Sequence, residues 1–243
     1  MPDGVCARSG RSVSNMKVAV VTGASRGLGL ELARALGQRG WRLVIDAREP
    51  GPLEAARAEL AELTDVTAVA GDVSDERHRR ALLEAAGRAL DLLVNNASVL
   101  GPSPQPRLAD YPLTTLEEVY RVNVFAPLAL VQAALPLLRP GAVIVDVTSD
   151  AAVEAYEGWG GYGSAKAALE QLTRILAVEH PKLRIYAVDP GDMNTRMHQE
   201  AFPGEDISDR PPPAVSVPGL LALIEGGLPS GRYQAREVGP VTA

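Results

Sequence analysis

The sequence predicts an α/β fold with one doubly wound parallel sheet and helices on both of its faces. Short apolar runs alternate with longer stretches of helical spacing along most of the 243 residues, as in chains built from βαβ units. The runs are almost continuously apolar, which is typical of strands buried on both faces of a parallel sheet. A glycine-rich turn follows the first run, at residues 22–29. The length also suits a single domain.

The expected elements alternate from the first strand onward. Each strand is a short apolar run, and each helix is a stretch in which apolar residues return every three or four positions. The first helix shows this spacing at Leu28, Leu32 and Leu36. Expected strands cover residues 18–21, 43–45, 66–70, 92–94, 142–147 and 185–188, with a short one near 232–235. Expected helices cover residues 27–39, 53–63, 75–89, 113–138, 162–179 and 214–225.

Two irregular segments stand apart from this pattern. Residues 1–15 are rich in Gly and Ser and show no period, so we expect a disordered N-terminal extension, with Met16 as an alternative start. Residues 16–243 form the one expected domain. Within it, residues 192–213 hold few apolar runs, and an irregular segment of this length is expected to be a substrate lid.

Composition argues against several classes of partner and site. The formal net charge of -6 disfavours nucleic acid or an anionic membrane as the main partner, and no apolar run approaches the ~20 residues that span a bilayer. The single cysteine, Cys6, can form no intrachain disulfide, and it favours a reducing, cytoplasmic setting. The histidines lack metal-ligand spacing. We therefore expect no metal site, and we expect His78 and His180 to be solvated.

The turn at residues 22–29 has the features of a dinucleotide-binding site. Gly23 permits a tight turn after the strand, Gly27 lets the backbone approach a pyrophosphate, and Gly29 lets the helix pack closely on the sheet. The pyrophosphate would lie at the N-terminus of the next helix, where free N–H groups favour anions. An ordinary strand-to-helix turn without a ligand is the alternative. We favour the first interpretation, which gives residues 16–243 an NAD(P)-binding, Rossmann-type fold carrying both the cofactor and the substrate site.

A second motif supplies the groups that a carbonyl reduction needs. Tyr162 and Lys166 are four residues apart and share a helix face, and Ser149 follows the strand at 142–147. Ligands of open α/β sheets bind beyond the carboxyl ends of the strands, so Ser149 is expected at the same edge as the glycine turn. A carbonyl that accepts hydride needs a proton donor, and a lysine charge ~4 Å from a phenol is worth about 4 kcal/mol, or roughly three pK units. We therefore expect Tyr162 to have a pKa near neutrality, with Ser149 donating to the carbonyl oxygen.

These motifs together resemble the short-chain dehydrogenase/reductase family, in its compact single-domain branch, over about residues 17–195. Residues 22–29 match the family's T-G-x-x-x-G-x-G pattern. Residues 95–98 resemble its N-N-A-G, with Ser98 in place of the glycine. Ser149, Tyr162 and Lys166 match three of its four catalytic residues, including the thirteen-residue spacing between the first two.

The resemblance also implies roles for residues that spacing alone would not single out. Asn123 matches the fourth catalytic residue, which in relatives kinks its helix and positions a water leading to the lysine. Asp72 and Val73 match the pair that meets the adenine. Residues 190–195 resemble the turn that holds the nicotinamide carboxamide. Together, the motifs and the resemblance give the catalytic set Asn123, Ser149, Tyr162 and Lys166, and the cofactor contacts Gly23, Ser25, Arg26, Gly27, Leu28, Gly29, Arg48, Asp72, Val73, Asn95, Ala97, Tyr162, Lys166, Pro190, Gly191 and Thr195.

The end of the second strand bears on the choice between NAD and NADP. An acidic side chain here would bind the ribose 2′-OH of NAD, whereas an arginine suits the 2′-phosphate of NADP. The usual register of the family places Ala47 at the discriminating position, with Arg48 next to it and Arg26 approaching from the glycine turn. We therefore expect NADP(H). A shift of one residue would place Asp46 at the 2′-OH and favour NAD(H).

The predicted function is that of an NADP(H)-dependent oxidoreductase that interconverts a small-molecule ketone and alcohol, with Tyr162 as general acid and base. Expected substrate contacts are Tyr156, Trp159, Met193 and Met197, although the two aromatics could simply pack the loop. A cofactor-binding sensor or regulator, or an imine or enone reductase or epimerase, could use the same scaffold. From the resemblance we also expect a homodimer or homotetramer, formed through residues 113–138 and 162–179.

Overall fold

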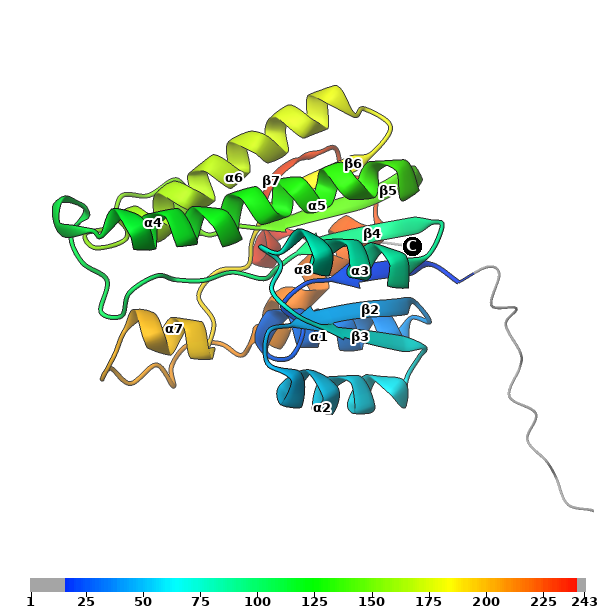
Figure 1. Ribbon diagram of the computed structural model, residues 1–243, viewed down its shortest axis with the longest axis horizontal. Helices are drawn as coiled ribbons and strands as arrows, with labels where there is room; N and C mark the ends of the chain where they lie inside the picture. The colour runs from blue at the N-terminus through cyan, green and yellow to red at the C-terminus, as the bar shows by residue number, and fades with distance from the viewer. Residues whose placement is uncertain (1–15, 240–243) are drawn as a thin grey trace, which may run out of the picture.

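The computed structural model describes residues 16–239, which build one seven-stranded parallel sheet (Figure 1). The strand order is β3-β2-β1-β4-β5-β6-β7, and every pairing is parallel. The strands are β1 (Val18–Val21), β2 (Arg42–Ala47), β3 (Val66–Ala70), β4 (Leu90–Asn95), β5 (Leu138–Val147), β6 (Arg184–Asp189) and β7 (Gly231–Gln234). The predicted disorder of residues 1–15 lies outside the described residues.

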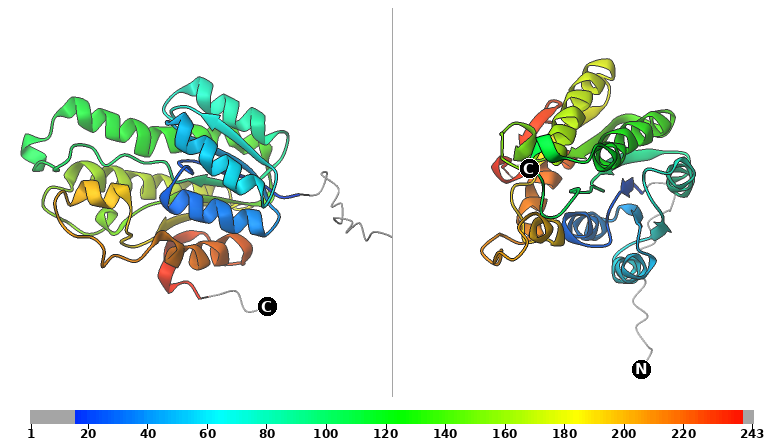
Figure 2. Two further views of the ribbon diagram at one scale, coloured as in Figure 1. Left: turned by 90° about the horizontal axis from the view of Figure 1, so that it is seen from below. Right: turned by 60° about the vertical axis from the view of Figure 1, so that its left-hand side comes forward.

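Helices cover both faces of the sheet (Figure 2). On one face lie α1 (Gly27–Gln38), α2 (Pro50–Ala61) and α8 (Val217–Glu225), and on the other lie α3 (Glu76–Ala86), α4 (Leu113–Tyr120), α5 (Ala126–Ala134) and α6 (Gly160–Glu179). A further short helix, α7 (Arg196–Ala201), lies within the segment predicted as a lid. The predicted fold class, a Rossmann-type doubly wound sheet, is therefore confirmed.

The central strands are mostly apolar because they send side chains into two cores. Alternate residues of a strand point to opposite faces, and in β1 this places Ala19 and Val21 in the core under α1, with Val18 and Val20 in the core under α3 and α5. All four side chains are buried. The continuous apolar runs of the sequence thus reflect a sheet with no solvent-facing side.

The order of the strands creates the crevice in which the site lies. From β1 the chain proceeds outward to β2 and β3, and from β4 it proceeds the other way to β5, β6 and β7. The loops at the carboxyl ends of β1 and β4 therefore diverge and leave a crevice between them. Open α/β sheets bind ligands in such a crevice. In Figure 1 these ends lie on the left, on the same side of the sheet as α7.

The helix predicted over residues 113–138 is interrupted, and it is shorter than expected. A π-helical segment, η3 (Arg121–Phe125), separates α4 from α5, and Leu138 already belongs to β5. The stretch Leu113–Leu137 is nevertheless 25 residues long, and its most apolar 18 residues have a mean hydropathy of 1.2, so its length and composition would allow it to cross a membrane. This corrects the expectation that no stretch approaches that length. Its most apolar part is 44% buried inside the fold, and core helices of soluble proteins meet the same length and composition criteria.

Candidate functional site

The glycine turn after β1 is held against β2 and β4 by close backbone contacts. Gly23 has a φ of +66°, and a Cβ there would lie 2.9 Å from the Cα of Ala97. A Cβ on Gly29 would lie 2.6 Å from the Gly23 carbonyl oxygen. By contrast, a Cβ on Gly27 would meet only Thr195, at 3.8 Å. The backbone at Gly27 is therefore the part of the turn that stays open toward the crevice.

The N-terminus of α1 offers hydrogen-bond donors to an anion. Arg26, the residue before the helix, makes no side-chain capping bond, and the first turn contains no acidic residue. The first N–H groups of a helix have no partner within it, and together with the helix dipole they favour a phosphate. The residues present, an open glycine backbone leading into an uncapped helix, thus fit the pyrophosphate of a dinucleotide.

Two residues that the sequence analysis did not assign hold this turn to the end of β4. The Thr22 hydroxyl accepts from the backbone N–H groups of Asn96 and Ala97, both at 3.0 Å, and donates to the Val94 carbonyl at 3.1 Å. The Asn96 side-chain amide donates to the Thr22 and Gly23 carbonyls at 2.8 and 3.1 Å. Both residues lie inside recognised motifs, at residues 22–29 and 95–98, and this was the available signal.

Asn95 behaves differently from Ala97, although both are predicted cofactor contacts. Ala97 lies against the glycine turn. The Asn95 side chain is buried and donates to the Asp146 carboxylate at 2.7 Å. Its amide is therefore committed to the neighbouring strand β5, away from the crevice.

The end of β2 places Asp46 and Arg48 in opposite environments. Asp46 is 1% exposed, and its carboxylate accepts from the Gly23 N–H at 2.6 Å and meets His78 Nε2 at 2.8 Å. His78 is buried, so the expectation of a solvated histidine is wrong, because this side chain faces the sheet to reach Asp46. Arg48 is exposed at the crevice. Asp46 thus serves the turn itself, which leaves Arg48 as the free side chain at this strand end.

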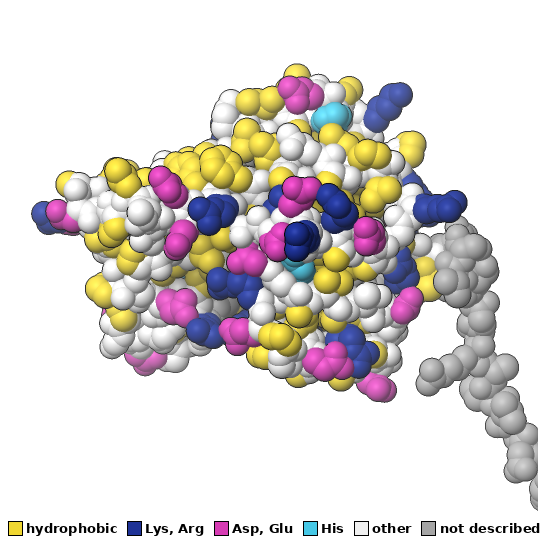
Figure 3. Space-filling view, in the orientation of Figure 1, with side chains coloured by type: hydrophobic (Ala, Val, Ile, Leu, Met, Phe, Trp, Pro, Cys, Tyr) yellow, Lys and Arg dark blue, Asp and Glu magenta, His cyan; other side chains and the backbone are white. Residues whose placement is uncertain are grey.

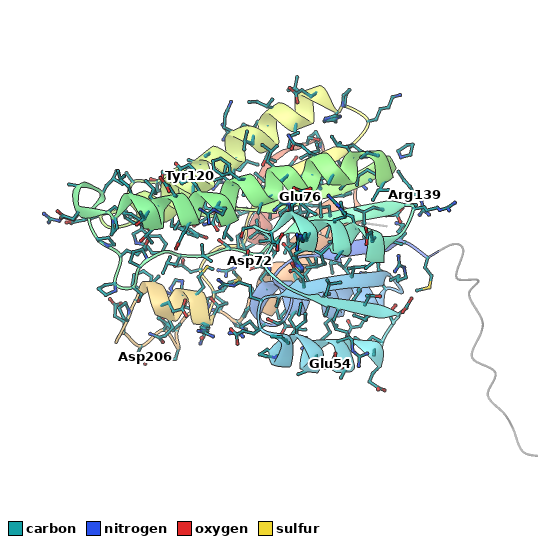
Figure 4. All side chains as sticks on the ribbon, in the orientation of Figure 1. Glu54, Asp72, Glu76, Tyr120, Arg139 and Asp206 are labelled. Carbon is teal, nitrogen blue, oxygen red and sulfur yellow. The ribbon has the colours of Figure 1, made fainter. Side chains whose placement is uncertain are left out.

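Charged side chains surround the position of Arg48. Arg26 pairs with Glu49 at 2.9 Å, and Glu49 also lies 3.6 Å from Arg196 of α7. Asp72, labelled in Figure 4, follows β3 at the same edge of the sheet. Burial disfavours its ionised form, but hydrogen bonds from Ser74 and the nearby charge of Arg48 outweigh burial and hold the pKa of Asp72 below its usual value. Three arginines from separate elements, Arg26, Arg48 and Arg196, therefore lie near the end of β2.

The structure brings Ser149 and Tyr162 to one cavity, together with residues of the lid segment. The cavity is lined by Leu100, Thr148, Ser149, Asp150, Trp159, Tyr162, Asp189, Pro190, Gly191, Asp192, Met193, Thr195, Met197, His198 and Ala201. Predicted substrate contacts Trp159, Met193 and Met197 are among them. Tyr156 is not, since it is 47% exposed and donates to Asp150 at 3.0 Å. The Ser149 hydroxyl also donates to Asp150, at 2.8 Å.

Lys166 is buried beneath Tyr162, but its ammonium group points elsewhere. Lys166 Nζ donates to the Val147 carbonyl at 2.8 Å and lies 5.4 Å from the centre of the Tyr162 ring. Burial lowers the pKa of Lys166 to about 8, opposed by the charge of Asp146. Burial raises the pKa of Tyr162 above its usual value, the charges of Asp150 and Asp189 add to this rise, and the nearby Ser98 side chain opposes it. The expected phenol pKa near neutrality is therefore not found in this structure, because the lysine charge is directed at a backbone carbonyl.

Asn123 lies in the π-helical segment η3, at the position where an irregular helix was expected. Its side chain is fully buried. Asn123 Oδ1 accepts from the Val99 N–H at 2.9 Å, and Nδ2 donates to the Val99 carbonyl at 2.8 Å. The wider turn of a π-helix is frequent at functional positions. Here it directs the amide toward the segment after β4.

A largely buried ionic network below the cavity joins the ends of β5 and β6 to α6 and β7. Glu170 of α6 accepts from Thr148 at 2.9 Å and from Arg232 of β7 at 3.0 Å. Arg232 also pairs with Asp189 at the end of β6, at 3.3 Å. Each buried charge has a partner, which such charges require. Because Thr148 directly precedes Ser149, the network holds the backbone at Ser149 in place.

Comparison with known proteins shows which family the chain resembles. Residues 17–206 match the family model described as short chain dehydrogenase. A rhamnolipid-biosynthesis 3-oxoacyl-[acyl-carrier-protein] reductase of Pseudomonas aeruginosa is 35% identical over 193 residues, which cover 74% of each chain. A short chain dehydrogenase from Pseudomonas syringae superposes with a TM-score of 0.84 at 30% identity, covering 90% of this chain and 94% of that one. An alcohol dehydrogenase from Thermococcus sibiricus, complexed with 5-hydroxy-NADP, superposes with a TM-score of 0.80 at 30% identity, covering 90% and 96%.

The buried lysine gives a first testable expectation. The chain has three lysines, Lys17, Lys166 and Lys182, so isotope-labelled methyl groups on them should give three lysine signals by NMR. The signal that is lost in Lys166→Met should titrate near pH 8. Because an ordinary lysine titrates near 10.5, the unfolded chain binds more protons between these values, and Lys166 should make the fold more stable as the pH rises through them. If this signal titrates near 10.5 instead, burial does not lower the pKa of Lys166 as expected.

Proposed function

Because the chain belongs to the short-chain dehydrogenase family, we propose that it is an NADP(H)-dependent oxidoreductase that reduces a ketone to an alcohol or runs the reverse reaction. The observation that carries the proposal is the shared cavity of Ser149 and Tyr162, which opens at the sheet edge where the glycine turn ends. A bound nicotinamide would supply or accept the hydride. The chain itself has to bind the cofactor, orient the carbonyl and move one proton.

The cofactor would be held by residues of the first half of the sheet. The open backbone at Gly27 and the N-terminus of α1 would bind the pyrophosphate, and Asp72 and Val73 would meet the adenine. Arg48 and Arg26 would bind the 2′-phosphate, since guanidinium groups suit phosphate geometry. The turn at residues 190–195, which lines the cavity beside Ser149, would hold the nicotinamide end.

Tyr162 would supply the proton to the carbonyl oxygen as the hydride reaches its carbon. The Ser149 hydroxyl, which donates to Asp150 in this structure, would turn to donate to the same oxygen and stabilise its developing charge. Lys166 would favour the phenolate by charge once its ammonium leaves the Val147 carbonyl. In the oxidation direction, Tyr162 would take the proton back from the alcohol.

The substrate is proposed to be a small carbonyl compound with an apolar portion. Trp159, Met193, Met197 and Leu100 provide apolar walls, and the thioether side chains can adapt to different shapes. Trp159 packs edge-on against Tyr162, with ring centres 5.9 Å apart. It would thus set the approach of the substrate to the proton donor.

Replacement of Tyr162 tests whether the site is catalytic. Tyr162→Phe should reduce NADPH-dependent turnover by at least about 10²-fold, because general acid catalysis contributes about that much or more. NADPH binding, followed by fluorescence titration, should change little. Tyr120→Phe, which removes a hydroxyl from α4 outside the cavity (labelled in Figure 4), is the matched control. Turnover that survives in Tyr162→Phe would contradict the mechanism, and cofactor binding without any turnover in the parent would favour a sensor.

Cofactor preference follows from the opposite placements of Arg48 and Asp46. The parent should prefer NADPH, and Arg48→Ala and Arg26→Ala should each lower kcat/KM for NADPH by about 10- to 100-fold, the value of a charge-assisted hydrogen bond. Neither variant should affect NADH to that extent. Arg57→Ala, on the exposed face of α2, is the control. If the parent prefers NADH, and Asp46→Ala alone changes the ratio, the assignment of Arg48 is wrong.

We further propose a homodimer or homotetramer that uses the helices above the sheet. Figure 3 shows hydrophobic side chains along the upper edge of the molecule, over α4, α5 and α6. Within residues 113–179, Leu113 is 73% exposed, Phe125 59% and Val178 81%. Light scattering should give a multiple of the 25.6 kDa chain mass, and Phe125→Glu should lower it. Val215→Glu, outside these helices, should not. A monomer mass for the parent at micromolar concentration would contradict this.

A further inference from the structure

Glu49 connects the proposed phosphate contact Arg26 with the predicted lid. It lies directly before α2, and its side chain makes no capping bond to that helix. Its carboxylate instead reaches across the end of β2. Glu49 Oε2 lies 2.9 Å from Arg26 Nη2 of the glycine turn, and Oε1 lies 3.6 Å from Arg196 Nη1 of α7. One carboxylate thus faces two arginines that are far apart in the sequence, and Arg26 is the closer of the two.

The helix that carries Arg196 contacts the glycine turn at one end and the cavity wall at the other. Thr195 caps α7 and lines the cavity, and a Cβ on Gly27 would meet the Thr195 methyl carbon at 3.8 Å. At the far end of α7, the ring of Phe202 packs against Trp159 of the cavity, with ring centres 5.9 Å apart. A change in the pairing of Arg196 can therefore reach the cavity through α7.

A 2′-phosphate and Glu49 would compete for the same arginine. A guanidinium group binds a phosphate and a carboxylate with the same fork of N–H donors, and the two anions repel each other. Arg196 offers Glu49 a second partner, because it lies within reach of the free oxygen of the carboxylate. Arg196 Nε also contacts Glu200 of α7 at 2.8 Å, so its charge is already shared within the lid.

We propose that Glu49 is a specificity-determining residue that lowers the affinity for a 2′-phosphate and ties the lid to the end of β2. Glu49 leaves Arg26 when the phosphate binds there, and it then pairs closely with Arg196 and draws α7 toward β2. The lid thus responds to NADP(H) and not to NAD(H). This inference rests on the proposed function, in which Arg26 binds the phosphate.

The expected effect on affinity is moderate because Glu49 is exposed. Solvent and salt screen its attraction to Arg26 and its repulsion of a phosphate. Glu49→Gln keeps the size of the side chain and removes its charge, so it isolates the electrostatic part. The exchange lies on the surface, and thermal unfolding should stay at the parent temperature.

Calorimetry with two fragments of the cofactor tests the competition without turnover. Adenosine 2′,5′-bisphosphate carries the 2′-phosphate, and adenosine 5′-monophosphate lacks it. Glu49→Gln should bind the bisphosphate about 3- to 10-fold more tightly than the parent does, with no change for the monophosphate. The matched control is Glu59→Gln, which removes a carboxylate from the Arg34–Glu59 pair of α1 and α2 and should alter neither affinity.

A fluorinated tryptophan reports the movement of the lid. The chain has two tryptophans, Trp41 and Trp159, so fluorine NMR should give two signals, of which the one lost in Trp159→Phe belongs to Trp159. The bisphosphate should shift this signal and the monophosphate should not, while buried Trp41 at the start of β2 serves as the internal control. Arg196→Ala should abolish the shift and change the affinity for the bisphosphate by less than about two-fold.

The outcomes separate this inference from the proposed function. If the parent prefers the bisphosphate but Glu49→Gln gains no affinity, Glu49 does not compete and the proposed function stands. A tenfold loss of bisphosphate affinity in Arg196→Ala would make Arg196 a phosphate contact and contradict its role as the second partner of Glu49. If Glu49→Gln gains affinity but the parent turns over no carbonyl compound, the role of Glu49 is upheld and the proposed function is wrong.

Discussion

The buried carboxylate of Asp46 is the contact on which the cofactor side of the site depends. It accepts the Gly23 N–H at the point where the chain leaves β1, and His78 supports it from α3. A charged acceptor makes a short, strong bond to a backbone donor, and an unpaired N–H at this depth would be costly. With Gly23 fixed, Gly27 faces the crevice and α1 begins with its first N–H groups free. Asp46 thus shapes the binding turn without being available to a ligand.

Periodicity was sufficient to predict the sheet but not the direction of single side chains. Each strand could be found because both of its faces are buried, which leaves a continuous apolar run. Asp46 and Arg48 lie two residues apart, and nothing local distinguishes the buried one from the exposed one. The difference arises from His78, a partner 32 residues away from Asp46. The same reason explains why His78 was wrongly expected in solvent.

In the candidate site, too, some features could be predicted from the sequence and others could not. The resemblance placed an irregular helix at Asn123, and the π-helical segment η3 lies there. Ser149 and Tyr162 share a cavity because β5 and α6 deliver them to the same sheet edge, which the motif spacing predicts. The direction of Lys166 was not predictable, since helix spacing fixes its face but not which acceptor its long side chain reaches. The bonds of Thr22 and the turn of Tyr156 toward Asp150 likewise depend on contacts made only after folding.

The strand order separates two tasks in space. Phosphate and adenine contacts are proposed on loops that follow β1, β2 and β3, whereas Trp159, Met193 and Met197 come from segments that follow β5 and β6. The halves meet at the crevice between β1 and β4, where the turn at residues 190–195 is proposed to serve both. A mutation of Trp159, Met193 or Met197 can therefore change the apolar cavity walls without touching the proposed phosphate and adenine contacts. Such a chain can acquire a new substrate over evolutionary time while it inherits its cofactor unchanged.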